Sequence, residues 1–295
     1  MPSPYVRRLR LGNELRDLRK AAGLTADQLA RRIGESRLKI SRLETGARKP
    51  DVADVMKVLE TLGIDEGTDR WRELVRVARD AAARGWWETQ SFSDMGGQAR
   101  WADVESGATS MRIYESHLIP GLVQTESYVR ARNDIVAGEG AVFNHAVTVA
   151  GRLRRQEEFT QKPDRTMAVI LEEQAIRRLV VPREVMAEQL QHLIGLVEHD
   201  QITLGIVPVE VELLDVRAPR APFTICTYDD PHDPVVVLLD QVAASQVLIE
   251  PDEVGPYLRL FDRLTAVALS SEDTLTYLVR ALKAINSGTR SRTRR

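Results

Sequence analysis

Four side chains able to ligate a metal ion lie close together in the segment DDPHDP, namely Asp229, Asp230, His232 and Asp233. Carboxylate and imidazole groups of this kind bind divalent metals. Two prolines interrupt the segment, however, and acidic residues mixed with proline are typical of a turn between two strands. We therefore interpret the segment as a solvated turn that connects strands, and we predict no metal site.

The chain lacks the other usual signatures of catalysis and metal binding. His192 and His199 are seven positions apart, whereas two ligands on one helix face need a spacing of about three or four. The single cysteine, Cys226, lies in the apolar run PFTICTY, where a buried structural thiol is more typical than a nucleophile. No GxSxG, P-loop or GxGxxG motif occurs. We predict that the protein is not an enzyme and uses no catalytic residue, metal or cofactor.

The segment LTADQLARRIGESRLKISRLETG, from Leu24 to Gly46, has the residue types that a helix-turn-helix requires at the required spacing. Ala30 is small, which lets two helices cross closely, and Gly34 supplies the positive φ of the turn between them. Apolar residues of both helices form a shared core: Leu29, Ile33, Ile40 and Leu43. The segment therefore predicts DNA binding, and a helical hairpin without that function is the alternative.

Charge is distributed unevenly along the chain. The first 50 residues hold 13 lysines and arginines against 5 acidic residues, and residues 274–295 hold 6 basic and no acidic residues, although the whole chain has a net charge of -2. The N-terminal surplus favours contact with phosphates, and the acidic stretch in between disfavours it. No apolar run approaches the roughly 18 residues that span a bilayer, and the N-terminus lacks the apolar core of a secretory signal. We expect a cytoplasmic protein without membrane contact.

The elements that position these residues follow from apolar spacing. Four short helices are predicted in the first 63 residues, over about Val6–Ala21, after the capping residues Thr25 and Ser36, and from Pro50 onward. A further amphipathic helix at residues 65–84 is expected to connect two domains. The first domain is therefore all-α.

The remainder alternates helical and strand patterns, which predicts an α+β domain. Helices are predicted at Glu126–Asn133, Ala146–Phe159, Arg183–His199, Pro251–Leu269 and Glu272–Ile285, and strands in MAVILEE, ITLGIVPVEVE, APFTICTY and PVVVLLDQ. The predicted organisation is a helix-turn-helix domain at residues 1–64, a linker helix at 65–85, an α+β domain at 86–285 and a disordered basic tail at 286–295.

Residues 10–63 resemble the xenobiotic-response-element (XRE) family of regulators, the relatives of phage repressors and Cro proteins. The resemblance is carried by Leu24-Thr25, Leu29-Ala30, the stretch Ser41–Gly46 and the closing Arg48-Lys49-Pro50. Two positions depart from the family pattern. Ala26 stands where a phosphate-contacting glutamine is usual, and Glu35 stands where the turn usually has an apolar residue. The first departure removes one backbone contact, and the second leaves the fold unaffected.

The resemblance implies that Ser36–Thr45 forms the recognition helix. It implies base contacts for Arg37, Leu38, Ser41 and Arg42 and phosphate contacts for Lys39 and Arg48. An arginine fork matches guanine O6 and N7, and a leucine packs against a thymine methyl group. The same interpretation pairs Glu44 with Arg19 as a structural contact. The full set of predicted DNA-binding residues is Thr25, Gln28, Ser36, Arg37, Leu38, Lys39, Ser41, Arg42, Arg48 and Lys49.

From Trp86 to about Ile285 the chain resembles the uncharacterised C-terminal domain of regulators from high-GC Gram-positive bacteria. The matching stretches are Arg84–Glu88, Arg112–Tyr128, Arg152–Phe159 and Ala221–Asp240. Relatives carry a loop rich in histidine and glycine before the last stretch, whereas Glu212–Arg220 of this chain contains neither residue. A site that depends on this loop is expected to be altered.

Three functions remain open from the sequence. The leading hypothesis is a dimeric transcription regulator that reads an inverted repeat of double-stranded DNA and whose acidic domain binds a small-molecule effector or a small partner protein encoded nearby. The alternative is an antitoxin-like DNA-binding protein whose second domain neutralises a partner protein. A third is an enzyme with an attached DNA-binding domain, for which no motif argues. The identity of the molecule that binds residues 86–285 would discriminate among these three functions.

Overall fold

The computed structural model describes residues 2–92, 98–138, 144–162, 164–213, 218–239 and 245–292. The chain forms two compact units that interleave along the sequence. Unit 1 comprises Met1–Thr89, Arg100–Ala108 and Tyr228–Pro234, and unit 2 comprises Gln90–Ala99, Thr109–Thr227 and Val235–Arg295. Unit 1 therefore includes two segments that the sequence places far from its N-terminal helices.

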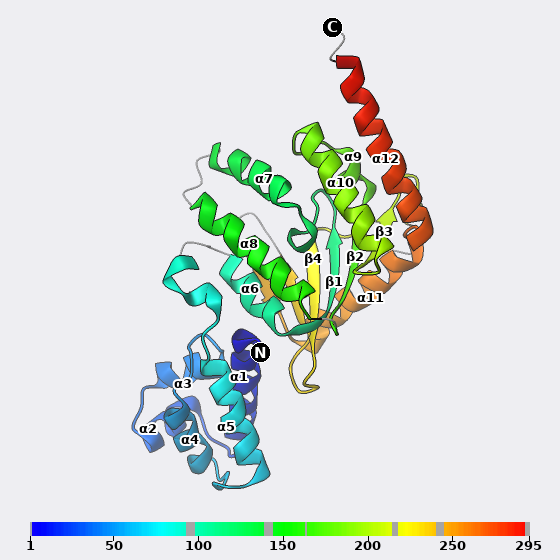
Figure 1. Ribbon diagram of the computed structural model, residues 1–295. Coiled ribbons are helices and arrows are strands. Elements are labelled where there is room, and N and C mark those ends of the chain that lie inside the picture. Colours follow the sequence, from blue (N-terminus) through cyan, green and yellow to red (C-terminus); the bar gives the residue numbers. More distant parts are fainter. Residues whose placement is uncertain are drawn as a thin grey trace. The chain divides into compact units, whose positions relative to one another are not determined.

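Unit 1 begins with five α-helices: α1 (Pro4–Ala21), α2 (Ala26–Ile33), α3 (Arg37–Glu44), α4 (Val52–Thr61) and α5 (Asp69–Ala82) (Figure 1). Each begins after a residue whose side chain accepts a hydrogen bond from a backbone N–H of the first turn, namely Ser3, Thr25, Ser36, Asp51 and Thr68. Such N-caps satisfy backbone donors that the helix itself leaves without partners. The predicted capping roles of Thr25 and Ser36 are confirmed.

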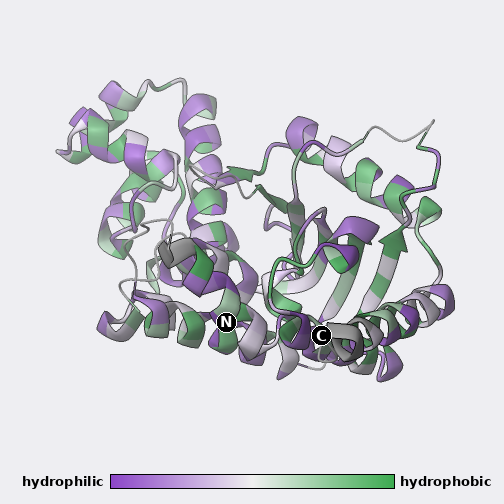
Figure 2. Cartoon of the chain, turned by 90° about the horizontal axis from the view of Figure 1, so that it is seen from above, coloured by the Kyte–Doolittle hydropathy of each residue, from purple (hydrophilic) through white to green (hydrophobic). Residues whose placement is uncertain are grey.

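One hydrophobic core holds these five helices together. It includes Leu11 and Leu15 of α1, Leu29 of α2, Ile40 of α3 and Leu59 of α4. Helix α5 contributes five more buried residues to the same core: Leu74, Val75, Val77, Ala78 and Ala81. The helix expected to connect two domains is therefore an integral part of unit 1. The helices alternate hydrophilic and hydrophobic stretches, as amphipathic helices do (Figure 2).

Unit 2 is built on a six-stranded mixed sheet in the order β3-β2-β1-β4-β5-β6. The strands are β1 (Ala108–Glu115), β2 (Thr166–Glu172), β3 (Thr203–Val207), β4 (Phe223–Tyr228), β5 (Val236–Leu239) and β6 (Gln246–Leu248). Strands β1, β2 and β3 pair in parallel, with Ile113 opposite Val169 and Val169 opposite Leu204. Strands β4, β5 and β6 pair antiparallel.

Helices make the crossover connections between the parallel strands, as parallel pairing requires. The 3-10 turn η3 (Gly121–Val123) and helices α7 (Glu126–Gly138) and α8 (His145–Thr160) lie between β1 and β2, and α9 (Glu173–Arg177) and α10 (Arg183–Glu198) lie between β2 and β3. Helices α11 (Pro251–Val267) and α12 (Ser271–Arg292) follow β6. The remaining elements are η1 (Trp86–Glu88), η2 (Gln90–Phe92) and α6 (Gln98–Ser106).

The sheet is buried against α11 on one face. Phe261 and Leu264 of α11 pack with Tyr114 of β1, Ile170 of β2 and Phe223 of β4 in one core. The rings of Tyr114 and Phe223 stack at a centroid distance of 5.4 Å. Because side chains alternate along a strand, Met167 and Val169 of β2 point to the opposite face, the side of α8 and α10 (Figure 1).

The predicted fold class, an all-α helix-turn-helix domain followed by an α+β domain, is confirmed. The four predicted strand segments contain β3, β4 and β5 and all of β2 except Thr166, with residues 240 and 241 of the last segment outside the described part of the chain. Strands β1 and β6 were not predicted, nor were α6 and α9. Strand β1, ATSMRIYE, has no clear apolar alternation, and its Arg112 lies half-buried over the ring of Phe261, 5.9 Å from the centroid.

The C-terminal residues also differ from expectation. Helix α12 continues to Arg292 and thus covers most of the segment predicted to be a disordered tail, and residues 293–295 lie outside the described part. Once a helix is nucleated each further residue adds a hydrogen bond at little cost, and arginine is a good helix former. Among the described residues, no helix combines the length and the apolar character needed to cross a bilayer.

Candidate nucleic-acid interface

Helices α2 and α3 are joined by the tight turn that the sequence predicts. Gly34 has φ +72°, a left-handed conformation that glycine adopts without a steric penalty. Ala30 of α2 is buried, and the backbone N–H of Glu35 donates to its carbonyl oxygen at 2.9 Å. Ile40 and Leu29 are also buried in the core of unit 1. The orientation of α3 relative to α2 is thus fixed by packing and by the turn.

Helix α1 fixes the other end of α3. Arg19 donates from Nε to Oε1 of Glu44 at 2.6 Å and from Nη2 to Oε2 at 2.8 Å. Arg16 Nη2 donates to the backbone oxygen of Glu44 at 3.2 Å. A Cβ built on Gly12 would lie 2.5 Å from that same oxygen, so only glycine permits this approach of α1 to α3. The predicted structural pairing of Glu44 with Arg19 is confirmed.

The outward face of α3 carries the four residues for which base contacts are predicted. Arg37, Leu38, Ser41 and Arg42 are all exposed. Leu38 has a relative exposure of 57%, which is large for an apolar side chain. Among the described residues, Arg37 and Arg42 form no ion pair. The face is therefore available to a ligand with acceptor groups and apolar surface.

Two lysines of the predicted DNA-binding set, Lys39 and Lys49, are engaged within the protein. Lys39 Nζ lies 2.6 Å from carboxylate oxygens of both Glu35 and Asp54. The hydrogen bonds that Lys39 donates to Asp54 and Glu35 raise its pKa. Lys49 Nζ contacts a carboxylate oxygen of Glu88. These lysines tie α3 and the following loop to neighbouring elements, whereas Arg48 is exposed.

Three further predicted DNA-binding residues act as caps in this structure. Thr25 and Gln28 form a reciprocal capping box at the start of α2, with Gln28 N donating to Thr25 Oγ1 at 3.2 Å and Thr25 N donating to Gln28 Oε1 at 2.8 Å. Ser36 Oγ accepts from the backbone N–H of Lys39 at 3.2 Å. All three caps are exposed, and their contact with DNA stays a prediction.

The sequence analysis did not predict a cluster of buried charges around Arg7 and Arg10 of α1. The DDPHDP segment is a turn between β4 and β5, as predicted, but only part of it is solvated: Asp229 and His232 are exposed, whereas two of its carboxylates are largely buried. The side chain of Asp233 is 3% exposed and that of Asp230 is 16% exposed, and both face Arg7 and Arg10 of α1. Only three-dimensional proximity reveals this, because more than 200 residues separate the partners.

The distances define the cluster closely. Asp230 Oδ2 accepts from Arg10 Nη1 at 2.8 Å and from Arg7 Nη1 at 3.0 Å. Asp233 Oδ2 lies 3.2 Å from Arg7 Nη2. Burial by itself would raise the pKa of Asp230, but hydrogen bonds from the His232 backbone and from Arg10 and Arg7 hold that pKa well below its usual value. Burial raises the pKa of the more deeply enclosed Asp233 despite the same arginines.

A third acidic residue from outside the N-terminal helices, Asp103, binds the start of α1. Asp103 Oδ1 accepts from Ser3 Oγ and from the backbone N–H of Tyr5, both at 2.9 Å, and Asp103 Oδ2 accepts from Arg8 Nη2 at 3.4 Å. Burial raises the pKa of Asp103. Within the described residues, no group of three or more histidine, cysteine or acidic side chains is arranged to hold a metal ion. Cys226 is buried in β4, as predicted.

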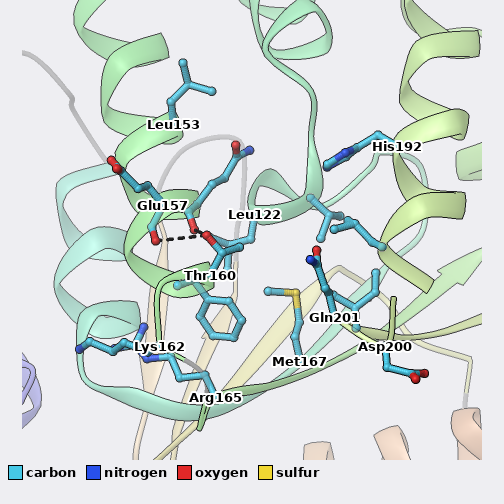
Figure 3. A pocket seen from close by; sticks show the side chains of 15 residues that line it. Leu122, Leu153, Glu157, Thr160, Lys162, Arg165, Met167, His192, Asp200 and Gln201 are labelled. Carbon is cyan, nitrogen blue, oxygen red and sulfur yellow. Dashed lines mark hydrogen bonds between the residues drawn. The ribbon is translucent and has the colours of Figure 1, made fainter. Parts of the chain in front are cut away.

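Unit 2 contains a pocket of about 700 Å³ between η3, α8, α10, the start of β2 and the residues just before β3 (Figure 3). Its apolar lining includes the buried side chains of Phe159, Met167 and Ile202. Lys162 and Arg165 lie at one side of the opening, and His192 lies at the other (Figure 3). The Arg165 guanidinium stands over the Phe159 ring at 5.5 Å from its centroid. Sequence analysis did not identify these pocket residues.

Comparison with known families assigns both the N-terminal and the C-terminal part of the chain to a described domain family. Residues 98–280, more than half of the chain, match the family described as Domain of unknown function (DUF5753). The chain belongs to this family. Residues 10–71 match the family described as Helix-turn-helix domain. The chain therefore carries a helix-turn-helix DNA-binding domain ahead of the DUF5753 region. The predicted helix-turn-helix domain and C-terminal regulator domain are confirmed, whereas membership of the XRE family stays a prediction. No curated protein and no solved structure matches the chain.

The DUF5753 match includes segments that belong to unit 1. Residues 100–108 and 228–234 lie within the matched range 98–280 but pack with the N-terminal helices. Asp103, Asp230 and Asp233 are all in these two segments. The helix-turn-helix domain of this DUF5753 protein is thus completed by residues of the family domain itself.

Proposed function

We propose that the protein is a sequence-specific transcription regulator of the phage-repressor type, a member of the XRE class, which reads DNA with α3. The observation that supports this most is the face formed by Arg37, Leu38, Ser41 and Arg42. It combines two arginines without ion pairs among the described residues, an exposed leucine and a hydroxyl group on one helix. Such a set suits guanine edges and thymine methyl groups in the major groove.

The anchoring of α3 supports the same proposal. Specific readout requires that a recognition helix enter the groove in a fixed orientation. Here Ile40 holds α3 in the core, Gly12 allows α1 to approach it closely, and Arg19 binds Glu44 at its C-terminal end. Arg48, just beyond α3, stays exposed and is suited to a backbone phosphate.

We further propose that two copies of the chain bind an inverted repeat. A single module of this size buries little DNA surface. Two-fold dimers of helix-turn-helix proteins read half-sites whose centres are about 10 base pairs or a multiple apart. Selection of bound duplexes from a random pool, followed by sequencing and footprinting with the native chain, tests both points. We expect an enriched sequence with dyad symmetry. Enrichment without any consensus would overturn sequence-specific reading, and a consensus without symmetry would overturn the dimer.

The effector of this regulator is proposed to be a small organic molecule bound in the pocket of unit 2. A volume of about 700 Å³ lies within the usual range of small-molecule sites, which combine an apolar lining with a few polar groups. Phe159, Met167 and Ile202 suit an apolar body. Lys162 and Arg165 at one side suit an anionic group on the same molecule.

A further inference from the structure

We infer that the β4–β5 turn, Tyr228–Pro234, is the element through which the DUF5753 domain controls the recognition helix. The inference rests on the proposed function, because it concerns how DNA reading by α3 is regulated. Its basis is an unbroken series of contacts inside unit 1, from the turn to α1 and from α1 to α3. Neither the helix-turn-helix match nor the DUF5753 match assigns a role to this turn.

The first step joins the turn to α1. Asp230 binds Arg7 and Arg10, which project one turn apart from the same helix, and Arg76 of α5 lies 3.3 Å from the same carboxylate oxygen. The side chains of Arg7 and Arg10 are 5% and 2% exposed. Ion pairs so poorly accessible to water are little screened by salt. Arg10 also pairs with Glu14 and Glu73 of the N-terminal helices, but the turn supplies two further carboxylates, since Asp233 lies 3.2 Å from Arg7 and 3.5 Å from Arg10. The position of α1 therefore depends on the turn.

The second step joins α1 to α3. From Arg10 the helix continues through Gly12, which lies against the backbone of Glu44, to Arg16 and Arg19, which bind the same residue. A backbone approach this close allows no sliding of one helix without the other. A displacement of α1 is thus passed directly to the C-terminal end of the recognition helix.

The third step joins the turn to the sheet of the DUF5753 domain through the chain itself. The turn is the direct continuation of β4, whose residue Cys226 pairs with Val236 of β5 immediately after the turn. Inside unit 1, Tyr228 at the end of β4 donates its hydroxyl to Val104 O at 3.1 Å. A change in the β4–β5 pair moves both ends of the turn. Regulation then amounts to a choice between a docked turn, which holds α1 and α3 in place, and a released turn.

The test removes one charge while keeping the turn. In Asp230→Asn the amide oxygen can still accept the hydrogen bond that the backbone N–H of His232 donates to Asp230 Oδ1 at 3.1 Å. The ion pairs of residue 230 with Arg7 and Arg10 are lost, and those of Asp233 remain. Asp229→Asn is the matched control, because it is the same substitution at the neighbouring position, where the side chain is exposed.

Two measurements on the full chain decide the matter. Operator affinity, measured by fluorescence anisotropy on the selected duplex, is expected to fall in Asp230→Asn by about 5- to 150-fold, the usual range of coupling between sites, and to stay within about twofold in Asp229→Asn. Amide hydrogen exchange is expected to rise in α1 and α3 of Asp230→Asn, with β1 and β2 unchanged. Exchange rising throughout the chain would mean general unfolding and would overturn the inference.

The two proposals fail separately. If the native chain selects no DNA sequence, the proposed function fails, while hydrogen exchange still reports whether the turn controls α3. If the native chain binds its operator and Asp230→Asn matches Asp229→Asn in affinity and in α3 exchange, the turn does not control the recognition helix. In that case the inference is wrong and the proposed function stands.

Discussion

Glu44 in the last turn of α3 receives both hydrogen bonds of the Arg19 guanidinium fork, at 2.6 and 2.8 Å, and the two side chains are only 8% and 12% exposed. We expect Glu44→Ala to lower the free energy of unfolding by about 3–5 kcal/mol, because it leaves Arg19 charged and poorly solvated. Urea denaturation measures the loss. Glu35→Ala, which removes one of two partners from the more accessible Lys39, should cost at most about 1 kcal/mol. Equal losses of unfolding free energy in the two variants would show that the buried Arg19–Glu44 pair contributes no more than the accessible Lys39 pair.

Gly12 is expected to tolerate no side chain. Gly12→Ala would place a Cβ 2.5 Å from the backbone oxygen of Glu44, so α1 and α3 must separate, at a cost of about 1–3 kcal/mol. Gly195→Ala in α10 is the control, since nothing lies within 4 Å of its Cβ position. That substitution should stabilise the protein by roughly 0.5–1 kcal/mol through helix propensity. Thermal unfolding of both variants distinguishes the two, and a neutral Gly12→Ala would argue against the close approach.

Arg37 and Arg42 are predicted to contact bases, and Arg48 is predicted to contact a phosphate. Alanine at Arg37 or Arg42 should weaken binding to the selected duplex by about 1–3 kcal/mol and leave scrambled duplexes nearly unaffected. Alanine at Arg48 should weaken both alike and reduce the dependence on salt. Arg72→Ala, at an exposed position of α5, serves as the control. Unchanged specificity in an Arg37→Ala, Arg42→Ala double variant would remove α3 as the reading element.

The turn should contribute stability that depends on pH. Because its arginine partners hold the pKa of Asp230 below the ordinary value, the stabilisation is complete above about pH 4, the ordinary range of an aspartate. It is lost as the pH falls toward the lowered pKa of the folded state. The stability difference between the native chain and Asp230→Asn is therefore expected to be constant from pH 6 to 8 and to shrink below about pH 4. A difference that persists undiminished in acid would contradict the ion-pair account.

The pocket of unit 2 should bind an amphipathic anion. Anilinonaphthalene sulfonate, which has an aromatic body and one sulfonate, is a suitable probe, and we expect it to fluoresce with the native chain at one equivalent. Leu196→Trp should abolish most of this signal, because Leu196 lines the pocket and an indole fills it. Leu179→Trp makes the same change at an exposed leucine outside the lining and should leave the signal intact. Equal signals from both variants would place the probe elsewhere.

Local sequence patterns predicted what depends on nearby residues. Gly34 and the caps Thr25 and Ser36 define α2 and α3 because a turn and a helix start are set within a few residues. The pairing of Glu44 with Arg19 came from family resemblance. The role of Asp230 could not be predicted, since its partners lie on a helix 220 residues away, and an acidic turn looks the same in sequence whether water or arginine surrounds it.

The predicted domain boundaries also did not anticipate this long-range pairing. A boundary near residue 64 or 85 assumes that each domain is one continuous stretch, as most are. Unit 1 instead takes in Arg100–Ala108 and Tyr228–Pro234. Neither segment has a composition that marks it as part of an N-terminal helical domain. Asp103 belongs to unit 1 because its side chain accepts hydrogen bonds from Ser3 and Tyr5 at the start of α1.

The interleaving of the two units limits how such a protein can be recombined. A chimaera that joins residues 1–89 to a foreign sensor would carry the whole recognition helix and the pairing of Arg10 with Glu14 and Glu73, yet it would lack Asp230 and Asp233, which bind Arg7 and Arg10 in this chain. A functional exchange must either transfer the acidic turn as well or replace both arginines. The DNA-reading part and its DUF5753 partner are therefore expected to be inherited together, with substitutions at the turn matched by substitutions in α1.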